Sequence, residues 1–433
     1  MRIRGATWLF GAVTILSVGS GCRCNGDMRE QPDAPATNAT APTTNGSATH
    51  AAPAASKLST SVEIRRRSHI LSAGHGSSCV IVAGDIHCWG LPLGPKDGGR
   101  LTRVEPTGMR FEHVSRGNIH VCARTSGGEV WCAGGNSDGE LGVRSTESCP
   151  LTPYRDGTVD SYPCSGSFTR VPGLPAVKDV IVGSHRTCSI TEEGDVFCWG
   201  AVRESRDLGL HSIPPTKLQR LSNVARLALG SFFSCALRID GTVWCWGSNQ
   251  EGQLGRGTVD RDGHNEPMQV DGLSGVIEIG AGANFACALS IDGTDQQLRC
   301  WGANLRGQIG SAAPCTKDLC PQPVRVELPV GVGNVRELAL GGQTTCVLYE
   351  DGSLYCLGRL ASDIAGNGLR RAPGIPPMFA VANGGTHLVG ISGRGSVLTW
   401  GDRTLLAEEA HRIRCDKCVM PLIQVPGLKV DVH

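Results

Sequence analysis

Seven copies of one short pattern, a glycine followed five residues later by a cysteine, constrain the fold of this 433-residue chain more than any other feature. The cysteine is replaced only in the seventh copy, by Val389, and the repeated glycines are Gly74, Gly117, Gly183, Gly230, Gly282, Gly341 and Gly384. Each copy closes on a second glycine, at Trp89-Gly90, Ala133-Gly134, Trp199-Gly200, Trp246-Gly247, Trp301-Gly302, Leu357-Gly358 and Trp400-Gly401. Such a repeat indicates an architecture built from copies of one unit.

Each unit has the sequence of several short β-strands. Residues 227–229, 234–237 and 243–246 are rich in strand formers, and Asp240-Gly241 is a hairpin signal between the last two. A further strand, of the type found at 170–174, precedes each unit. Four strands in roughly 53 residues, repeated seven times, are typical of a β-propeller. We therefore predict an all-β fold over residues 61–433, a seven-bladed propeller with four-stranded antiparallel blades.

The strand pattern of residues 170–174 returns at the C-terminus, in residues 424–428. The first unit lacks a clear copy of this pattern. We therefore expect the C-terminal strand to complete blade one and close the ring.

The composition narrows the class of protein. The 59 Gly and 24 Pro disfavour a mainly helical chain. The net charge of +1 excludes a generic nucleic-acid binder, which needs an excess of Lys and Arg. The 20 Cys are unusual for a reduced cytosolic protein and point to an oxidising compartment.

The cysteines recur in pairs within the repeat. Six pairs place both residues on one face of adjacent strands, and the seventh copy lacks both partners, having Val389 and Thr399 instead. These predicted disulfides are Cys79–Cys88, Cys122–Cys132, Cys188–Cys198, Cys235–Cys245, Cys287–Cys300 and Cys346–Cys356. Three more predicted pairs, each stapling an inter-blade loop, are Cys149–Cys164, Cys315–Cys320 and Cys415–Cys418. For the last pair a redox motif or half a zinc site is the alternative.

The N-terminus has the sequence of an export signal. A basic start and a short apolar run predict a signal peptide over residues 1–21. The small residues before Cys22 resemble the lipobox of bacterial lipoproteins, which implies lipidation of Cys22; ordinary cleavage and secretion is the alternative. Residues 22–60, mostly small and polar, predict a disordered tether. We expect an extracytoplasmic protein, lipid-anchored in the bacterial envelope at the periplasm or cell surface, with the state of Cys24 open.

The units resemble the repeats of the regulator of chromosome condensation family. The matching residues are the Gly-x4-Cys step, Asp240-Gly241-x-Val243-Trp244, Trp246-Gly247 and the segment Asn249-x-x-Gly252-Gln253-Leu254-Gly255, which returns at 136–142 and 304–310. The resemblance covers residues from about 65 to 433 and implies a seven-bladed propeller. Eukaryotic founders of that family are nuclear nucleotide-exchange factors for a small GTPase, a partner that an exported chain would not meet.

No catalytic motif accompanies the repeat, so we expect no cofactor and no metal. The 12 His lack metal-binding spacing, and His75, His120 and His185 are interpreted as polar residues at strand ends. Asp260, Asp262, Asn265 and Glu266 form an acidic loop that does not match a calcium-binding loop.

The inter-blade loops are the best candidates for function. The longest, 143–168, contains the candidate binding residues Tyr154, Arg155, Asp156 and Tyr162. Loops 256–268, 311–323 and 402–420 occupy the same place in their repeats and should share one face of the ring. The sequence thus predicts a monomeric, non-enzymatic envelope protein that binds a protein or glycan through this face. The alternatives are a lyase or glycosidase with a site in the central channel, and a purely structural envelope component.

Overall fold

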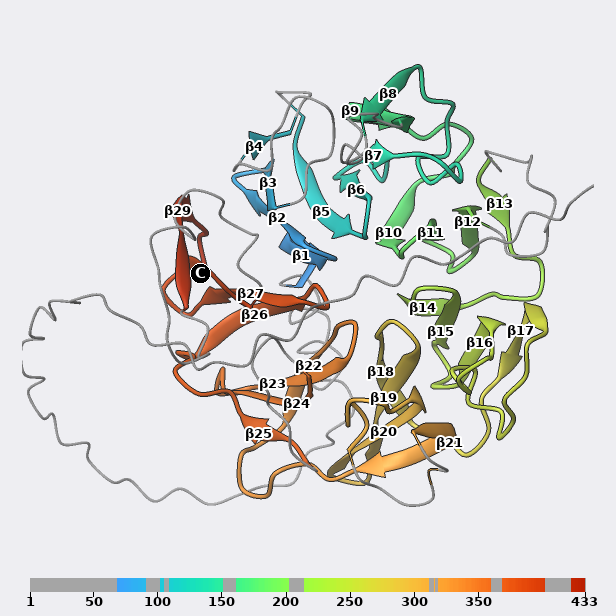
Figure 1. The fold of residues 1–433 in the computed structure, drawn as a ribbon, viewed down its shortest axis with the longest axis vertical. Coiled ribbons are helices and arrows are strands. Elements are labelled where there is room, and N and C mark those ends of the chain that lie inside the picture. Colours follow the sequence, from blue (N-terminus) through green and yellow to red (C-terminus); the bar gives the residue numbers. More distant parts are fainter. Residues whose placement is uncertain are drawn as a thin grey trace, which may run out of the picture.

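The repeat units fold into seven twisted sheets arranged around a central channel (Figure 1). The computed structural model describes residues 68–90, 102–104, 109–150, 161–201, 214–310, 315, 318–359, 368–401 and 422–432. All regular elements in these residues are β-strands except one short 3-10 helix, η1 (Ser68–Ile70). The predicted all-β, seven-bladed propeller is confirmed. Within the same residues, no helix is long and apolar enough to cross a membrane.

In six blades the strands follow one another in chain order from the channel outward, and in blade 2 the order is β5-β6-β7-β9-β8. The innermost strands are β1 (Leu71–Gly74), β5 (Phe111–Arg116), β10 (Val177–Val182), β14 (Val224–Leu229), β18 (Val276–Ala281), β22 (Val335–Leu340) and β26 (Met378–Asn383). The second strands are β2 (Ser77–Val82), β6 (His120–Thr125), β11 (Arg186–Thr191), β15 (Phe233–Arg238), β19 (Phe285–Asp292), β23 (Thr344–Tyr349) and β27 (His387–Ser392).

The two outer positions are more variable. The third strands are β3 (Asp85–Gly90), β7 (Val130–Gly135), β12 (Val196–Gly200), β16 (Val243–Ser248), β20 (Asp295–Ala303), β24 (Leu354–Gly358) and β28 (Ser396–Gly401). The fourth strands are β4 (Thr102–Arg103), β9 (Ser161–Arg170), β13 (Thr216–Lys217), β17 (Gly263–Gln269), β21 (Leu319–Val326), β25 (Arg370–Arg371) and β29 (Ile423–Lys429). Blade 2 has a fifth strand, β8 (Glu147–Pro150), which pairs with β9 at the outer edge. Six blades are therefore four-stranded, as predicted, and one is not.

The prediction that the C-terminal strand completes blade one is wrong. β29 pairs with β28 in blade 7, and blade 1 has its own fourth strand, β4. The physical reason is that the strand of the type at 170–174 pairs with the third strand of the preceding sheet, as β9 does with β7. The ring is therefore closed by packing between blades and not by an exchanged strand.

The repeated glycine before each cysteine explains how closely the blades approach. A Cβ built on Gly117 would lie 2.1 Å from the carbonyl oxygen of Gly183, and one on Gly230 would lie 2.8 Å from that of Gly282. The series closes on itself, because a Cβ on Gly384 in blade 7 would lie 2.3 Å from the carbonyl oxygen of Gly74 in blade 1. At Gly117 and Gly384 glycine is required because neighbouring backbones nearly touch. We call the seven repeated glycines the glycine ring.

Polar contacts between second strands follow the same circular order. His120 Nε2 lies 2.8 Å from Thr187 Oγ1, and the equivalent contact from blade 7 to blade 1 joins His387 Nε2 to Ser78 Oγ at 2.7 Å. An apolar cluster, including Leu71 of blade 1 and Ile391 of blade 7, lies across the same junction. The last and first blades therefore meet through the same kind of polar contact that joins blades 2 and 3.

Candidate functional site

The pairing register divides the ring into two faces. Second strands begin opposite the ends of third strands, since Phe233 pairs with Gly247 and Phe285 with Gly302. Turns between the first two strands and loops after the third strand therefore share one side, which we call the loop face. The Asp-Gly hairpins lie on the other side, the hairpin face. The predicted insertions at 143–168, 256–268 and 311–323 all begin on the loop face, whereas residues 402–420 lie outside the described residues.

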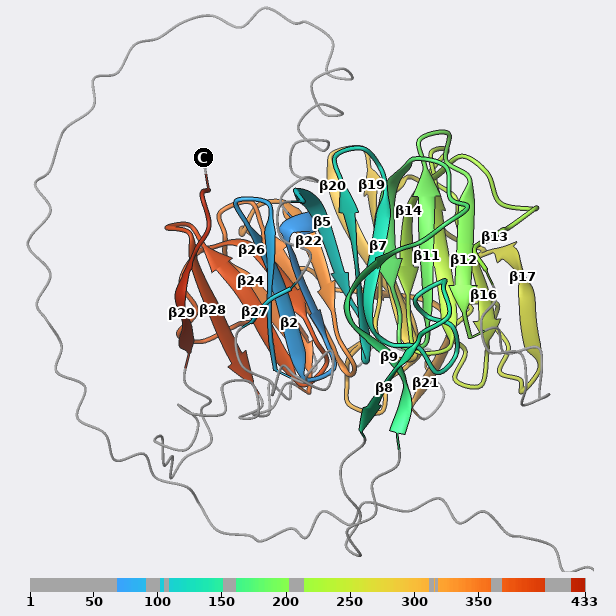
Figure 2. The ribbon, with the colours of Figure 1, turned by 90° about the horizontal axis from the view of Figure 1, so that it is seen from above.

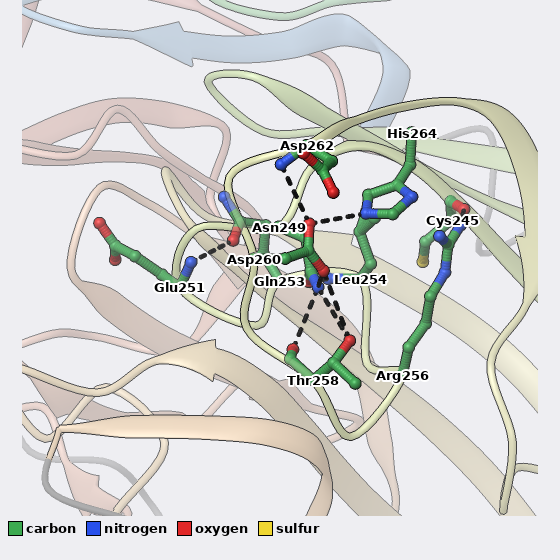
Figure 3. A network of polar contacts seen from close by, with 10 residues as sticks. All are labelled: Cys245, Asn249, Glu251, Gln253, Leu254, Arg256, Thr258, Asp260, Asp262 and His264. Atoms are coloured by element: carbon green, nitrogen blue, oxygen red, sulfur yellow. Dashed lines mark hydrogen bonds and ion pairs between the residues drawn. The ribbon is translucent and has the colours of Figure 1, made fainter.

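The repeated asparagine holds each loop in place. Asn249 Oδ1 accepts a hydrogen bond from Leu254 N at 3.2 Å, while Asn249 Nδ2 donates to Thr258 O at 3.0 Å (Figure 3). Asn136 makes the equivalent contact with Leu141 N at 2.9 Å, and Asn304 makes it with Ile309 N. A buried side-chain amide that satisfies backbone donors and acceptors in this way fixes the loop's path.

The acidic loop of blade 4 is held in place by the same asparagine, Asn249. Asp260 accepts hydrogen bonds from Asn249 Nδ2 at 2.8 Å and Asp262 N at 3.2 Å, and its Oδ1 lies 2.7 Å from His264 Nε2 (Figure 3). Partial burial alone would raise the pKa of Asp260, but the hydrogen bonds from Asn249 and His264 lower it. Glu266, at the end of the loop, pairs with Arg220. The carboxylates of Asp260 and Glu266 thus have protein partners.

Tryptophans of the Trp-Gly step anchor each loop to the following blade. Trp199 Nε1 donates to Glu140 O at 2.8 Å, and Trp301 Nε1 donates to Gln253 O at 2.9 Å. A Cβ on Gly142 would lie 3.2 Å from the Trp199 ring, so the loop glycine makes room for it. Trp199 and Trp301 are buried between blades.

Eight disulfides join the cysteines in pairs that the repeat alignment predicts. Six link second and third strands, where the partners lie directly opposite, as Cys235 and Cys245 do with their Cα atoms 4.1 Å apart. The other two, Cys149–Cys164 and Cys315–Cys320, lie at the loop face. Cys415–Cys418, Cys22 and Cys24 lie outside the described residues.

Blade 2 extends farthest on the loop face. Strands β8 and β9 form a hairpin that projects beyond the other strands (Figure 2), and Cys149–Cys164 joins the two strands. Tyr162 lies on β9 opposite Cys149 and is half-buried. Tyr154, Arg155 and Asp156, the other predicted binding residues, lie in the segment 151–160 between these strands, outside the described residues.

Beside this hairpin, three ionisable side chains meet at the junction of blades 2 and 3. His185 Nδ1 lies 3.2 Å from Asp138 Oδ2 and 3.9 Å from Glu140 Oε1. Asp138 and Glu140 belong to the loop of blade 2, and His185 to the turn before β11. Phe232 of blade 4 stacks on His185, with ring centroids 5.9 Å apart. We call Asp138, Glu140 and His185 the junction triad.

Glu140 is the buried member of the junction triad. Its Oε2 accepts the Asp138 backbone N–H at 2.8 Å, while its Oε1 has no hydrogen-bond partner in the described part of the chain. Burial raises the pKa of Glu140 to about 7. The hydrogen bond to Asp138 raises the pKa of His185 against the effect of its partial burial.

A second group of ionisable residues belongs to the innermost strands and to η1 before the first of them. These strands wall the cavity of the central channel, about 390 Å³, and Glu337 is the member of the group that lines it. The charged side chains lie near the hairpin-face starts of these strands, and we call them the channel ring: His69, His113, Asp179, Arg226, Glu278 and Glu337.

The channel ring is held together by close pairs. His113 Nδ1 lies 2.7 Å from Asp179 Oδ1, and His69 stacks on His113 at 4.4 Å between ring centroids. Burial would raise the pKa of Asp179, but His113 and His69 hold it well below its usual range. Burial and the neighbouring Glu278 raise the pKa of Glu337 to about 8. The ring thus contains carboxyl groups with pKa values shifted in opposite directions.

Family models match part of the repeat sequence. A model described as the regulator of chromosome condensation (RCC1) repeat matches residues 240–289, and a second model of the same repeat matches 224–253 and 276–308. The chain contains RCC1 repeats.

Curated RCC1-repeat relatives share about a quarter of their residues with it. The guanine nucleotide exchange factor SRM1 of Saccharomyces cerevisiae is 27% identical over 378 residues, 73% of this chain and 77% of the relative. The ultraviolet-B receptor UVR8 of Arabidopsis thaliana is 28% identical over 260 residues, 58% of this chain and 54% of the receptor. The chain thus spans about half the length of that receptor.

Solved structures agree on the fold. Yeast RCC1 (Prp20) bound to Kap60 superposes with a TM-score of 0.63 at 23% identity, covering 84% of this chain and 86% of that one. Human WBSCR16 superposes with a TM-score of 0.61 at 20% identity, covering 79% and 91%. At these identities the likeness shows the RCC1-type propeller and nothing further.

Sequence reasoning missed both ionisable groups, although the RCC1-type repeat contains a signal for each. Glu140 occupies the position of Gln253 and Gln308 in the other two complete loops, and His185 that of Asn284 and Gln343. His185 was interpreted as a polar strand-end residue, whereas it faces two carboxylates. The third position of the innermost strands is charged or polar in five successive blades, at His113, Asp179, Arg226, Glu278 and Glu337. Aligning the units column by column finds both groups.

Proposed function

We propose that this propeller is a non-enzymatic binding protein that presents the loop face around blade 2 to a protein partner. The observation that carries the proposal is the fifth strand of blade 2. The other six described sheets have four strands, whereas blade 2 adds the disulfide-linked β8–β9 hairpin on the loop face. A projecting hairpin on a rigid ring is an arrangement that suits recognition.

Exposed apolar side chains on the loop face support a protein partner. Phe232, which stacks on His185 beside blade 2, is 38% exposed, and Val259 and Leu305, in the loops of blades 4 and 5, are 46% and 59% exposed. Large apolar and aromatic side chains are enriched at the centre of protein interfaces, and polar groups surround them.

The relatives also favour a protein partner. SRM1 is named as a guanine nucleotide exchange factor, and a solved Prp20p structure is titled with its binding to Gsp1p and histones. These proteins are regulators that act on other proteins. We do not extend exchange activity to this chain, because its expected export and its disulfides separate it from a cytoplasmic GTPase.

The predicted location is part of the proposal. Residues 1–21 would direct export, Cys22 would be lipidated, and residues 22–60 would tether the propeller to the bacterial envelope. Secretion without a lipid is the alternative location. The eight disulfides support an oxidising compartment, in which such bonds persist.

The binding proposal is tested by shortening the hairpin. Deleting all of 143–168 would also remove Phe168, which is buried and lies 5.3 Å from Phe111. Replacing only residues 151–160 with a short Gly-Ser turn keeps the Cys149–Cys164 staple. We expect this variant to lose retention of envelope proteins that the wild type captures, while Ile239→Ser on the hairpin face retains them. Equal capture by wild type and shortened hairpin would refute the proposal.

The channel ring favours a second candidate function, that of a propeller enzyme such as a lyase or glycosidase. Glu337 lines the channel cavity and has its pKa raised to about 8, so it is the channel carboxyl suited to act as a general acid. Glycan cleavage measured as new reducing ends or unsaturated products, lost in Glu337→Gln, would establish it. No turnover across a panel of envelope polysaccharides would leave binding as the function.

A further inference from the structure

We propose that the junction triad of Asp138, Glu140 and His185 binds a divalent transition-metal ion, for which Zn²⁺ is the best match. Metal binding at this site is independent of whether the loop face has a protein partner. The proposal stands on donor geometry, on an unpartnered buried oxygen and on a comparison with the other blades.

The donor atoms have the spacing of a metal site. Asp138 Oδ2, Glu140 Oε1 and His185 Nδ1 all lie within 4.8 Å of one another. Zinc bonds of about 2.0–2.1 Å in a tetrahedral site place neighbouring donors roughly 3.3 Å apart. The distances from His185 Nδ1 are 3.2 Å to Asp138 Oδ2 and 3.9 Å to Glu140 Oε1. Small movements of the partly exposed Asp138 and His185 side chains would complete the geometry.

Glu140 supplies an oxygen that lacks a donor. Its side chain has no exposed surface, so water does not solvate it. Oε2 is occupied by the Asp138 backbone N–H, whereas Oε1 faces His185 without a hydrogen bond among the described residues. The 3.9 Å contact of Oε1 with His185 Nδ1 is too long for a hydrogen bond, and a bound cation would give this buried oxygen a closer interaction.

Equivalent junctions show that the fold does not need these side chains. At the junction of blades 4 and 5 the three positions hold Glu251, Gln253 and Asn284, and Asn284 Nδ2 donates to Glu251 Oε1 at 3.1 Å. Gln253 Oε1 accepts the Glu251 backbone N–H just as Glu140 Oε2 accepts that of Asp138. The scaffold is therefore complete with a neutral amide at this position, and in blades 2 and 3 Glu140 supplies a carboxyl group and His185 an imidazole instead.

The donor set selects the class of ion. One imidazole with two carboxylates suits Zn²⁺ and related transition metals, whereas Ca²⁺ takes six to eight oxygen ligands. Three protein ligands leave a tetrahedral ion one open position. Asp138 and His185 are 41% and 37% exposed, so this position would face the solvent on the loop face, where water or a donor from another molecule could occupy it.

The test is calorimetric titration of Zn²⁺ into the metal-stripped full propeller, with Co²⁺ absorption as a report on coordination. We expect saturable one-to-one binding. Glu140→Gln should weaken it by more than about 100-fold, since even outer-shell changes cost roughly 10–100-fold. His185→Asn should do the same. The matched control Glu251→Gln, at the equivalent loop of blade 4, should leave the affinity unchanged.

The variants are chosen so that an unfolded protein cannot be mistaken for one with reduced metal affinity. Glutamine already occupies positions 253 and 308, so Glu140→Gln should keep the wild-type unfolding midpoint without metal. Asp179→Asn tests the channel ring as another zinc site and should leave the titration unchanged. The proposal is overturned if the wild type shows no saturable binding at micromolar Zn²⁺, if folded Glu140→Gln binds as tightly as the wild type, or if Asp179→Asn abolishes the binding.

Discussion

Alanine substitutions in the glycine ring should destabilise the fold to different degrees, according to how close the added Cβ lies to the next blade. Gly117→Ala would place a Cβ 2.1 Å from Gly183 O and 2.6 Å from Val182 Cγ1. The neighbouring blade would have to move away by about 1 Å to relieve these contacts. Gly183→Ala would meet Gly230 O and Leu229 Cβ at 3.2 Å, which a shift of a few tenths of an ångström relieves. Gly127→Ala, in an exposed turn, would meet nothing closer than Thr125 Oγ1 at 3.9 Å.

The expected losses follow these distances. Overpacking costs about 1–3 kcal/mol and occasionally more, so we expect Gly117→Ala to lose about 3 kcal/mol or fail to fold. Gly183→Ala should lose about 1 kcal/mol, and Gly127→Ala should stay within about 0.5 kcal/mol of the wild type. None of these glycines has a positive φ, so the comparison isolates close approach from backbone strain.

Guanidinium unfolding without reductant, followed by tryptophan fluorescence, measures the series. The reasoning also predicts that Gly384→Ala resembles Gly117→Ala, because its Cβ would lie 2.3 Å from Gly74 O across the closing junction. Equal stability of Gly117→Ala and Gly127→Ala would refute the close approach of the blades. A Gly384→Ala variant with the unfolding midpoint of the wild type would refute closure of the ring between blades 7 and 1.

Two further predictions concern a hairpin staple and the channel. The double variant Cys235→Val, Cys245→Thr copies Val389 and Thr399, which face each other on adjacent strands of blade 7. It should fold, but its free energy of unfolding should fall by about 2–3 kcal/mol in the same denaturant assay. An unchanged unfolding midpoint would contradict stabilisation by this disulfide. Glu337 has its folded pKa raised to about 8, so it stabilises the fold only while protonated, and stability should fall as pH rises from about 4.5 to 8, by at most about 1.4 kcal/mol per pH unit. Glu337→Gln should flatten this dependence in unfolding curves at pH 5, 6.5 and 8, and a parallel fall in the variant would contradict burial of that carboxyl.

The local parts of the fold were predictable because each depends on short-range sequence patterns. Asp240-Gly241 fixes a hairpin, and the hairpin register then places Cys235 opposite Cys245. The number of blades follows from counting the glycine step. The sheet that the C-terminal strand joins could not be predicted, because in a repeated sequence the fourth strand can be assigned to the unit before it or to the unit after it. The pairing of Trp244 with Gln269 settles the choice in blade 4.

The candidate site was predicted only in outline. The loop face could be inferred because insertions recur at one position of the repeat. The junction triad was missed because its members come from consecutive units, with Glu140 and His185 separated by 45 positions in the sequence. Each residue alone has the sequence context of a polar group at a strand end. Their contact depends on the close approach of neighbouring blades, which only the assembled ring provides.

Site-specific photo-crosslinking in the native envelope tests most directly whether the loop face around blade 2 is the binding surface. A photoreactive residue in place of Phe232, on the loop face, is compared with one in place of Ile239, on the hairpin face; both side chains are exposed and both lie in blade 4. We expect a discrete crosslinked protein from position 232 that disappears when residues 151–160 are shortened, and none from position 239. Crosslinks from position 239 alone, or a crosslink at 232 that persists without the hairpin tip, would contradict the proposed surface.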